Sequence, residues 1–186
     1  LRSVVSQHLK PGTVNFFVNK NTRNTRRVGY LSAAFPEARF VHITRHPIAT
    51  SYSMSRVAFF GSLPVFWRGG ASVGELVSRG VDPLVLAAEF WTRETMAASD
   101  ALRSLPPGSV LETRYEDFVD DPGGHLRLVF ELVGRDVPQE TRALLESREV
   151  SSRNRSALMA LPAEEQRSIW HVAGGVASAL GYSASM

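Results

Sequence analysis

The stretch ARFVHITRHPIATSYSM, residues 38–54, predicts a strand that runs directly into a helix. Residues 39–44 mix apolar and β-branched side chains over the length of a strand. Pro47 suits the first position of a helix, where its missing N–H costs nothing. Arg45 therefore falls at the carboxyl end of a strand, the edge at which open α/β sheets bind ligands. A guanidinium beside a helix start can hold a phosphate there, or it can simply cap the edge of the sheet.

Strand and helix patterns alternate along the rest of the chain. Strands are expected at 14–18 and 110–115, and helices at 26–35, 47–59, 83–105, 122–133 and 162–180. This alternation predicts an α/β fold with a parallel sheet covered by helices on both faces. Residues 60–82 are rich in glycine and include two large aromatic side chains. We interpret them either as a mobile lid or as a plain surface excursion.

Composition limits the classes of protein to which the chain can belong. With 186 residues and 44% hydrophobic content, a single domain over residues 1–186 is expected. The absence of cysteine excludes disulfides, thiolate chemistry and cysteine-ligated zinc. The net charge is +3, and basic and acidic residues are interleaved, so we expect no nucleic-acid partner. No apolar run is long enough to span a membrane and no signal peptide is evident, so a cytoplasmic protein is expected. The oligomeric state stays open.

Four stretches, in order, carry a resemblance to a known family. They are VNKNTRN (18–24), FPEARFVHITRHPIATSYS (35–53), LETRYEDFVDDPGGHLRLVFELVG (111–134) and SIWHVAGGVASALGYS (168–183). Together they resemble the P-loop sulfotransferases of the bacterial type. The resemblance implies a P-loop NTPase-like sulfotransferase fold and the co-substrate 3'-phosphoadenosine-5'-phosphosulfate.

The resemblance assigns the nucleotide to the strand–helix junction. It implies that Arg45 and Ser53 bind the 3'-phosphate of the donor, and that Tyr115 meets the adenine. The alternative for Tyr115 is a half-buried aromatic residue at the strand end. Ser51 does not match the family's spacing, so we expect it on the helix surface. His46 stands where the family usually has aspartate or asparagine. It could sense or contact the nucleotide, but we expect it at the surface.

Three further basic residues receive roles from the same resemblance. Lys20 matches the lysine that neutralises charge on the transferring group and on the leaving oxygen, a catalytic role. Arg153 and Arg155 fall where the family often places a basic residue on the donor phosphate; solvation in a loop is an equally good interpretation. No metal is implied, and no cluster of metal-ligating residues is evident. Glu116 and Asp117 could form a catalytic acid pair, but neighbouring strand residues point to opposite faces. We therefore expect them to stabilise the turn after their strand.

The family's phosphosulfate-binding loop has no counterpart in the sequence. It would lie N-terminal to Leu1, so we expect the N-terminal strand–loop–helix to be missing and the 186 residues alone to be inactive. The chain is then expected to be either a fragment of an active enzyme or a truncated, inactive relative. The catalytic base is unplaced, and the acceptor, either a small molecule or a glycan or peptide, is not specified. Two alternatives remain: a nucleotide kinase of related P-loop fold, and a non-catalytic nucleotide-binding or interaction module.

Overall fold

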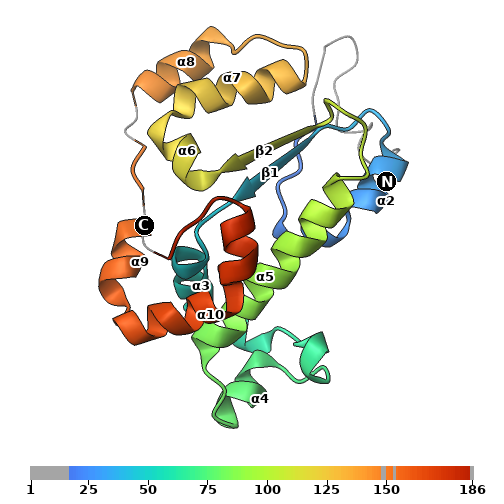
Figure 1. Ribbon diagram of the computed structural model, residues 1–186. Helices are drawn as coiled ribbons and strands as arrows, with labels where there is room; N and C mark the ends of the chain where they lie inside the picture. Colours follow the sequence, from blue (N-terminus) through green and yellow to red (C-terminus); the bar gives the residue numbers. More distant parts are fainter. Residues whose placement is uncertain (1–16, 148–149, 153, 185–186) are drawn as a thin grey trace.

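The computed structural model describes residues 17–147, 150–152 and 154–184. Figure 1 shows the course of the chain through these residues. In chain order the elements are η1 (Thr22–Arg26), α2 (Val28–Ala34), β1 (Phe40–Thr44), α3 (Pro47–Ser55), η2 (Phe60–Ser62), η3 (Phe66–Arg68), α4 (Val73–Ser78), α5 (Pro83–Leu102), β2 (Val110–Arg114), α6 (Tyr115–Asp120), α7 (Pro122–Leu132), α8 (Gln139–Glu146), α9 (Asn154–Ala160) and α10 (Ala163–Ala179).

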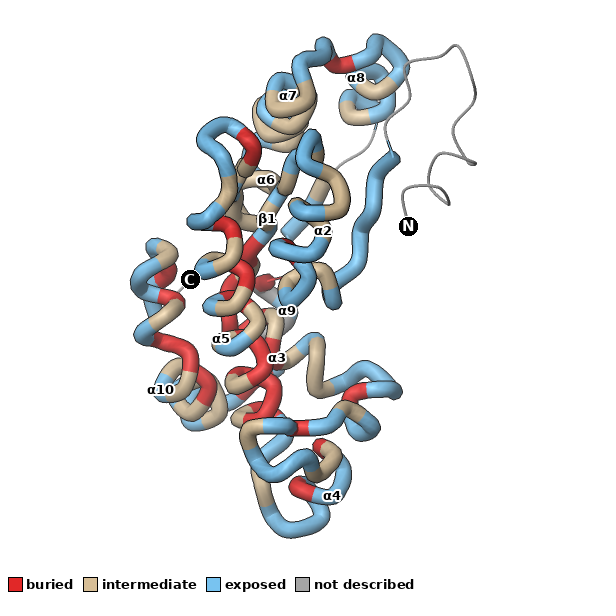
Figure 2. The backbone as a smooth tube through the Cα atoms, turned by 90° about the vertical axis from the view of Figure 1, so that its right-hand side faces the viewer, coloured by how far each residue is buried: buried red, intermediate tan, exposed pale blue. Residues whose placement is uncertain are grey.

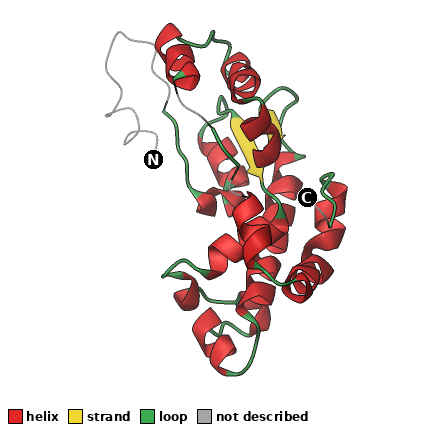
Figure 3. Cartoon of the chain, turned by 90° about the vertical axis from the view of Figure 1, so that its left-hand side faces the viewer, coloured by secondary structure: helices red, strands yellow, loops and turns green. Residues whose placement is uncertain are grey.

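The two strands pair in parallel, as the alternation of elements predicts. Their register runs from Phe40 opposite Val110 to Thr44 opposite Arg114. Because the last residues of the two strands are partners, α3 and α6 begin next to each other at the same edge of the sheet. Figure 3 shows the small sheet in yellow among the helices. The predicted α/β class, a parallel sheet flanked by helices, is confirmed.

Helix α5 is the longest element, and α3 and α10 pack against it. Asp82 caps its start by accepting a 2.7 Å hydrogen bond from the Leu84 backbone N–H, and Pro83 occupies the first turn. Figure 2 shows that buried residues follow these three helices. One core cluster joins them through Ile48, Leu84, Ala88 and Ile169, and it also includes Leu161 from the turn before α10. The core thus lies beyond the carboxyl edge of the sheet and supports the junction between β1 and α3.

The expectation of a sheet covered on both faces is wrong for the described residues. Val41 and Ile43 lie on the same face of β1 and are 40% and 58% exposed. His42 and Thr44 point the other way, and Thr44 is buried. The prediction was based on the apolar side chains of β1, which include those on the exposed face. The sequence gives the type of each side chain, but it does not show whether another element covers that face of the strand.

Several predicted boundaries shift. The strand expected at 14–18 lies partly outside the described residues, and Phe17 and Val18 are exposed with no strand assigned. The helix expected at 26–35 is split between η1 and α2, and the helix from Pro47 ends at Ser55 instead of 59. The predicted starts of α5 at Pro83 and of α7 at Pro122 are confirmed. At the start of α7, Asp121 Oδ1 accepts a 2.8 Å hydrogen bond from the Gly124 N–H. Among the described residues, no helix is long and apolar enough to cross a membrane.

Residues 60–82 form an ordered helical excursion and not an irregular loop. Ser72 and Glu75 form a reciprocal capping box at the start of α4, which sets the direction of that helix. Beneath it lies a separate core cluster made of Phe60, Val65, Val73, Leu76, Leu86, Ala87 and Phe90. Because part of this cluster belongs to α5, the excursion is attached to the central helix.

Candidate functional site

The junction between β1 and α3 is built around His46, which caps the helix with its side chain. His46 Nδ1 accepts a 3.3 Å hydrogen bond from the Ile48 backbone N–H, and the Nε2 atom lies 2.9 Å from the Ser183 carbonyl oxygen. Nε2 must therefore carry the proton. The imidazole is 2% exposed and stacks on Trp170 at 5.9 Å between ring centroids. Burial lowers the pKa of His46 below its ordinary value of 6.5. The expected surface placement is wrong, and the ring is neutral.

Arg45 stands immediately before this cap, with its guanidinium held from two sides. Its Nε donates a 2.7 Å hydrogen bond to Asn154 Oδ1. Its Cζ lies 4.8 Å from the centroid of the Tyr115 ring, a cation–π contact. The Arg45 carbonyl oxygen accepts a 3.0 Å hydrogen bond from Trp91 Nε1 on α5. Within the described part of the chain, neither terminal nitrogen of the guanidinium has a hydrogen-bond acceptor.

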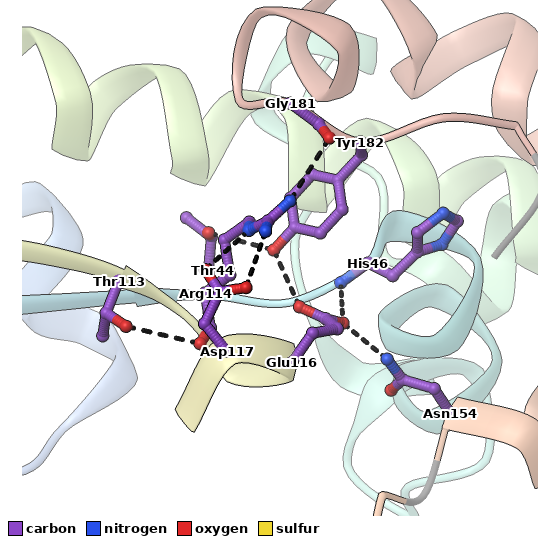
Figure 4. Close-up of polar contacts among 9 residues, drawn as sticks. All are labelled: Thr44, His46, Thr113, Arg114, Glu116, Asp117, Asn154, Gly181 and Tyr182. Carbon is purple, nitrogen blue, oxygen red and sulfur yellow. Dashed lines mark hydrogen bonds and ion pairs between the residues drawn. The ribbon is translucent and has the colours of Figure 1, made fainter. Parts of the chain in front are cut away.

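Glu116 lies at the centre of a group of polar contacts that includes His46, Asn154 and Tyr182 (Figure 4). Its Oε1 accepts hydrogen bonds from the His46 backbone N–H at 3.0 Å and from Asn154 Nδ2 at 2.5 Å. Its Oε2 accepts one from the Tyr182 hydroxyl at 3.1 Å. Three segments that are distant in the sequence thus meet on a single carboxylate.

Tyr182 connects the carboxyl-terminal segment to the end of β1. Its hydroxyl lies 3.1 Å from Thr44 Oγ1, and burial raises the pKa of this hydroxyl well above its ordinary value. With Tyr182 donating to Glu116, the Thr44 hydroxyl can donate to Tyr182 in turn. The buried hydroxyls and the carboxylate therefore form a continuous chain of hydrogen bonds.

A neighbouring ion pair stabilises the turn from β2 into α6. Arg114 makes a bidentate contact to Asp117, with Nε at 2.8 Å from Oδ2 and Nη2 at 2.6 Å from Oδ1. This hydrogen bonding lowers the pKa of the Asp117 carboxyl. Arg114 Nη1 also donates to the Gly181 carbonyl at 3.3 Å, as Figure 4 shows. The prediction that Glu116 and Asp117 organise this turn is consistent with these contacts, and Glu116 reaches further than predicted.

The sequence-predicted site residues lie in different surroundings. Arg45 and Tyr115 are in contact, as described above. Ser53 lies on the exposed side of α3, and no contact among the described residues joins it to Arg45. Ser51, which we expected at the surface, is fully buried, and its hydroxyl has no partner among the described residues. That expectation is wrong because α5 and α10 cover more of α3 than its own sequence reveals.

Lys20 is exposed and immediately precedes Asn21, the N-cap residue of η1. The Asn21 side chain caps η1 by accepting a 2.9 Å hydrogen bond from the Arg23 N–H. At the end of η1, Arg26 Nε donates a 2.6 Å hydrogen bond to Glu94 on α5. The segment that carries Lys20 is therefore attached to the same central helix that supports Arg45.

Arg153 lies outside the described residues, and the side chain of Arg155 is not among those described. Sequence reasoning selected these two arginines and passed over Asn154, which lies between them and contacts Arg45. Buried polar residues such as Asn154 and His46 look like ordinary loop residues in the sequence. Only the Leu-Gly-Tyr stretch at the end of α10 pointed toward Tyr182. Among the described residues, no group of three His, Asp or Glu side chains could hold a metal ion.

The fold defines an α/β protein in which two parallel strands lead into helices at one edge, with an arginine at that edge. Residues 2–139 match the sequence profile of the sulfotransferase family. The chain belongs to the sulfotransferase family.

One solved structure, the sulfotransferase domain from the curacin biosynthetic pathway, has a TM-score of 0.66 and 17% identity to this chain. The alignment covers 98% of this chain and 67% of that one. At this level of identity the likeness demonstrates a shared fold alone. Among curated proteins, none matches this sequence.

Proposed function

We propose that this chain carries the nucleotide side of a sulfotransferase donor site that takes 3'-phosphoadenosine-5'-phosphosulfate as co-substrate. The observation that supports the proposal is the state of Arg45. Its Nε is occupied by Asn154, its planar face rests on Tyr115, and its two terminal nitrogens have no acceptor within the described residues. Two parallel N–H donors of this kind fit a phosphate in bidentate fashion.

The surroundings of Arg45 favour an anion as its ligand. The guanidinium stands where β1 passes into α3, so it shares its position with the positive end of the helix dipole. The His46 ring nearby is neutral, and the Glu116 carboxylate is already engaged by three hydrogen-bond donors. Among Arg45 and the described residues that contact it, Arg45 alone can supply the positive charge for a phosphate.

Tyr115 is proposed to contact the adenine, and Ser53 the 3'-phosphate together with Arg45. One face of the Tyr115 ring is turned toward the guanidinium, so the nucleobase would meet another side of the ring. Arg153 and Arg155 are also proposed to bind a phosphate of the donor, and this proposal rests on the family resemblance alone. Each of these roles is separable from that of Arg45 by substitution.

The reaction proposed is an in-line displacement at sulfur. The acceptor hydroxyl or amine forms a bond to sulfur and gives up its proton to a general base or to solvent. The bond from sulfur to the 5'-phosphate oxygen breaks at the same time, and adenosine 3',5'-bisphosphate leaves. Lys20 would stabilise the negative charge that develops on the transferring group and the leaving oxygen. A small molecule, or a glycan or peptide, would supply the hydroxyl or amine. We also propose a cytoplasmic setting, because a chain without cysteine needs no oxidising compartment.

Calorimetry on the 186-residue chain tests the nucleotide site directly. Adenosine 3',5'-bisphosphate should bind more tightly than AMP, which lacks the 3'-phosphate. The preference should be about tenfold to a hundredfold, the value of one charge-assisted phosphate contact. Equal dissociation constants for the two nucleotides would overturn the proposal.

Sulfuryl transfer from labelled donor to a panel of hydroxyl and amine acceptors tests the reaction itself. Where turnover is measured, Lys20→Ala should lower kcat by about a hundredfold or more, and donor affinity should change little. A loss of donor affinity with unchanged kcat would assign Lys20 to ground-state binding instead.

A further inference from the structure

We infer that Asn154 and Glu116 are positioning residues that orient Arg45 toward the 3'-phosphate of the nucleotide. The inference rests on the proposed function, since it specifies how that same site is held ready for its ligand. Neither residue needs to contact the nucleotide. Both act through the guanidinium and through the backbone that carries it.

The orientation of the Asn154 amide follows from the chemistry of its two neighbours. Arg45 Nε can only donate, so the amide oxygen of Asn154 must face it, at 2.7 Å. The ionised Glu116 carboxylate can only accept, so the amide nitrogen must face Oε1, at 2.5 Å. Asn154 is 5% exposed, and a buried amide with both ends bonded has a single orientation. Glu116 thereby determines which atom Asn154 presents to Arg45.

Glu116 also holds the chain on both sides of Arg45. It accepts from the backbone N–H of His46, the next residue, and through the Tyr182 hydroxyl it is connected to Thr44, the preceding residue. Figure 4 shows Glu116 between these contacts. With the Arg45 carbonyl bonded to Trp91, the backbone at this position has little freedom left.

The consequence is a preorganised arginine. Asn154 occupies the Nε atom of Arg45, and the Tyr115 ring lies against the guanidinium. The edge that carries Nη1 and Nη2 is the part of Arg45 that can meet a ligand. A long side chain that is already ordered loses less rotamer entropy when its ligand binds. Loss of Asn154 should therefore weaken the contact to the 3'-phosphate, although the charge of Arg45 is unchanged.

The test compares dissociation constants for adenosine 3',5'-bisphosphate and AMP, and the melting temperature, on the same samples. Asn154→Ala and Glu116→Ala should each reduce the preference for the bisphosphate by about threefold to tenfold, the value of an ordering hydrogen bond. Asp117→Asn is the matched control. It removes a carboxylate from the same helix and disturbs Arg114, but it leaves the contacts of Arg45 intact, so the preference should be retained.

A double-mutant cycle shows whether Asn154 acts through Arg45. In an Arg45→Ala background, Asn154→Ala should have no further effect on the preference. A purely structural role would instead lower the melting temperature and shift both dissociation constants together in either background.

The outcomes separate the two proposals. Wild-type protein that does not distinguish the two nucleotides would overturn the proposed function. Wild-type protein that does distinguish them, with an unchanged preference in folded Asn154→Ala and Glu116→Ala proteins, would overturn the positioning inference alone.

Discussion

Arg45 Nε donates a 2.7 Å hydrogen bond to Asn154 Oδ1 across 109 residues of sequence. The contact joins the end of β1 to the start of α9, two segments that no local pattern connects. It turns an arginine at a sheet edge into one with a defined direction.

Arg45→Lys should abolish most of the preference for adenosine 3',5'-bisphosphate over AMP. An ammonium group cannot reproduce the two parallel donors of a guanidinium, and it cannot bond Asn154 and a phosphate in the same geometry. The expected loss is about 1.5–3 kcal/mol of binding free energy. Calorimetry and thermal unfolding on the same samples check it. A lowered melting temperature beside an unchanged preference would assign Arg45 a structural role only.

Substitutions at Tyr115 should separate the ring from its hydroxyl. Tyr115→Phe keeps the aromatic face on Arg45, so nucleotide affinity should fall by no more than about 1 kcal/mol. Tyr115→Ala removes the face, and its effect should be clearly larger, since the cation–π contact and the proposed adenine contact are lost together. Titration with AMP checks this comparison. Equal effects of the two variants would contradict the role of the ring.

Stability should fall as the pH is lowered through the range in which histidine titrates. Burial lowers the pKa of His46, so the folded protein holds the ring neutral while the unfolded chain takes up a proton below about its ordinary value of 6.5. The free energy of unfolding therefore decreases below that pH, by at most about 1.4 kcal/mol per pH unit, until the folded-state pKa is passed.

His46→Asn is the control for this pH dependence, because asparagine can still cap α3 but does not titrate. Urea unfolding of both proteins between pH 7.5 and pH 5 measures the difference. Glu116 and the Ser183 carbonyl, which face the ring, oppose the effect of burial and reduce its size. Parallel profiles for the two proteins would contradict the assignment to His46.

Gly174→Ala and Gly175→Ala should act in opposite directions. A Cβ at Gly174 would lie 2.7 Å from Trp170 Nε1, so the indole that stacks on His46 would have to move. We expect a loss of about 1–3 kcal/mol of stability. A Cβ at Gly175 meets nothing within 4 Å, and alanine there should add about 0.5–1 kcal/mol. Chemical denaturation measures the stability of both variants. Equal changes in stability would show that the Trp170 side chain moves away from a Cβ at Gly174 at no cost.

Ser51→Ala and Ser53→Ala test which hydroxyl of α3 serves the nucleotide. The Ser51 hydroxyl is buried without a partner in the described residues, so its removal should raise stability by up to about 1 kcal/mol. Nucleotide preference should be unchanged. Ser53→Ala should leave stability nearly unchanged and weaken binding of the bisphosphate. The reverse result would transfer the proposed phosphate contact from Ser53 to Ser51.

The secondary structure around the candidate site could be predicted from the sequence by itself. Side-chain periodicity, proline geometry and short-range caps predict the strand that ends at Thr44, the helix starts at Pro47, Pro83 and Pro122, and the parallel pairing. These depend on residues a few positions apart. Four stretches that occur in the same order as in the sulfotransferase family also predicted membership of that family. The match over residues 2–139 confirms this prediction.

Other features were decided only when the chain folded. The burial of His46 and Ser51, the open face at Ile43 and the convergence on Glu116 depend on segments that are far apart in the sequence. Glu116 finds its partners 38, 66 and 70 residues away. A polar residue has the same appearance in a sequence whether it is solvated or buried. Only the packing of other elements around it removes water and makes its hydrogen bonds specific, because an unpaired polar group is costly once buried.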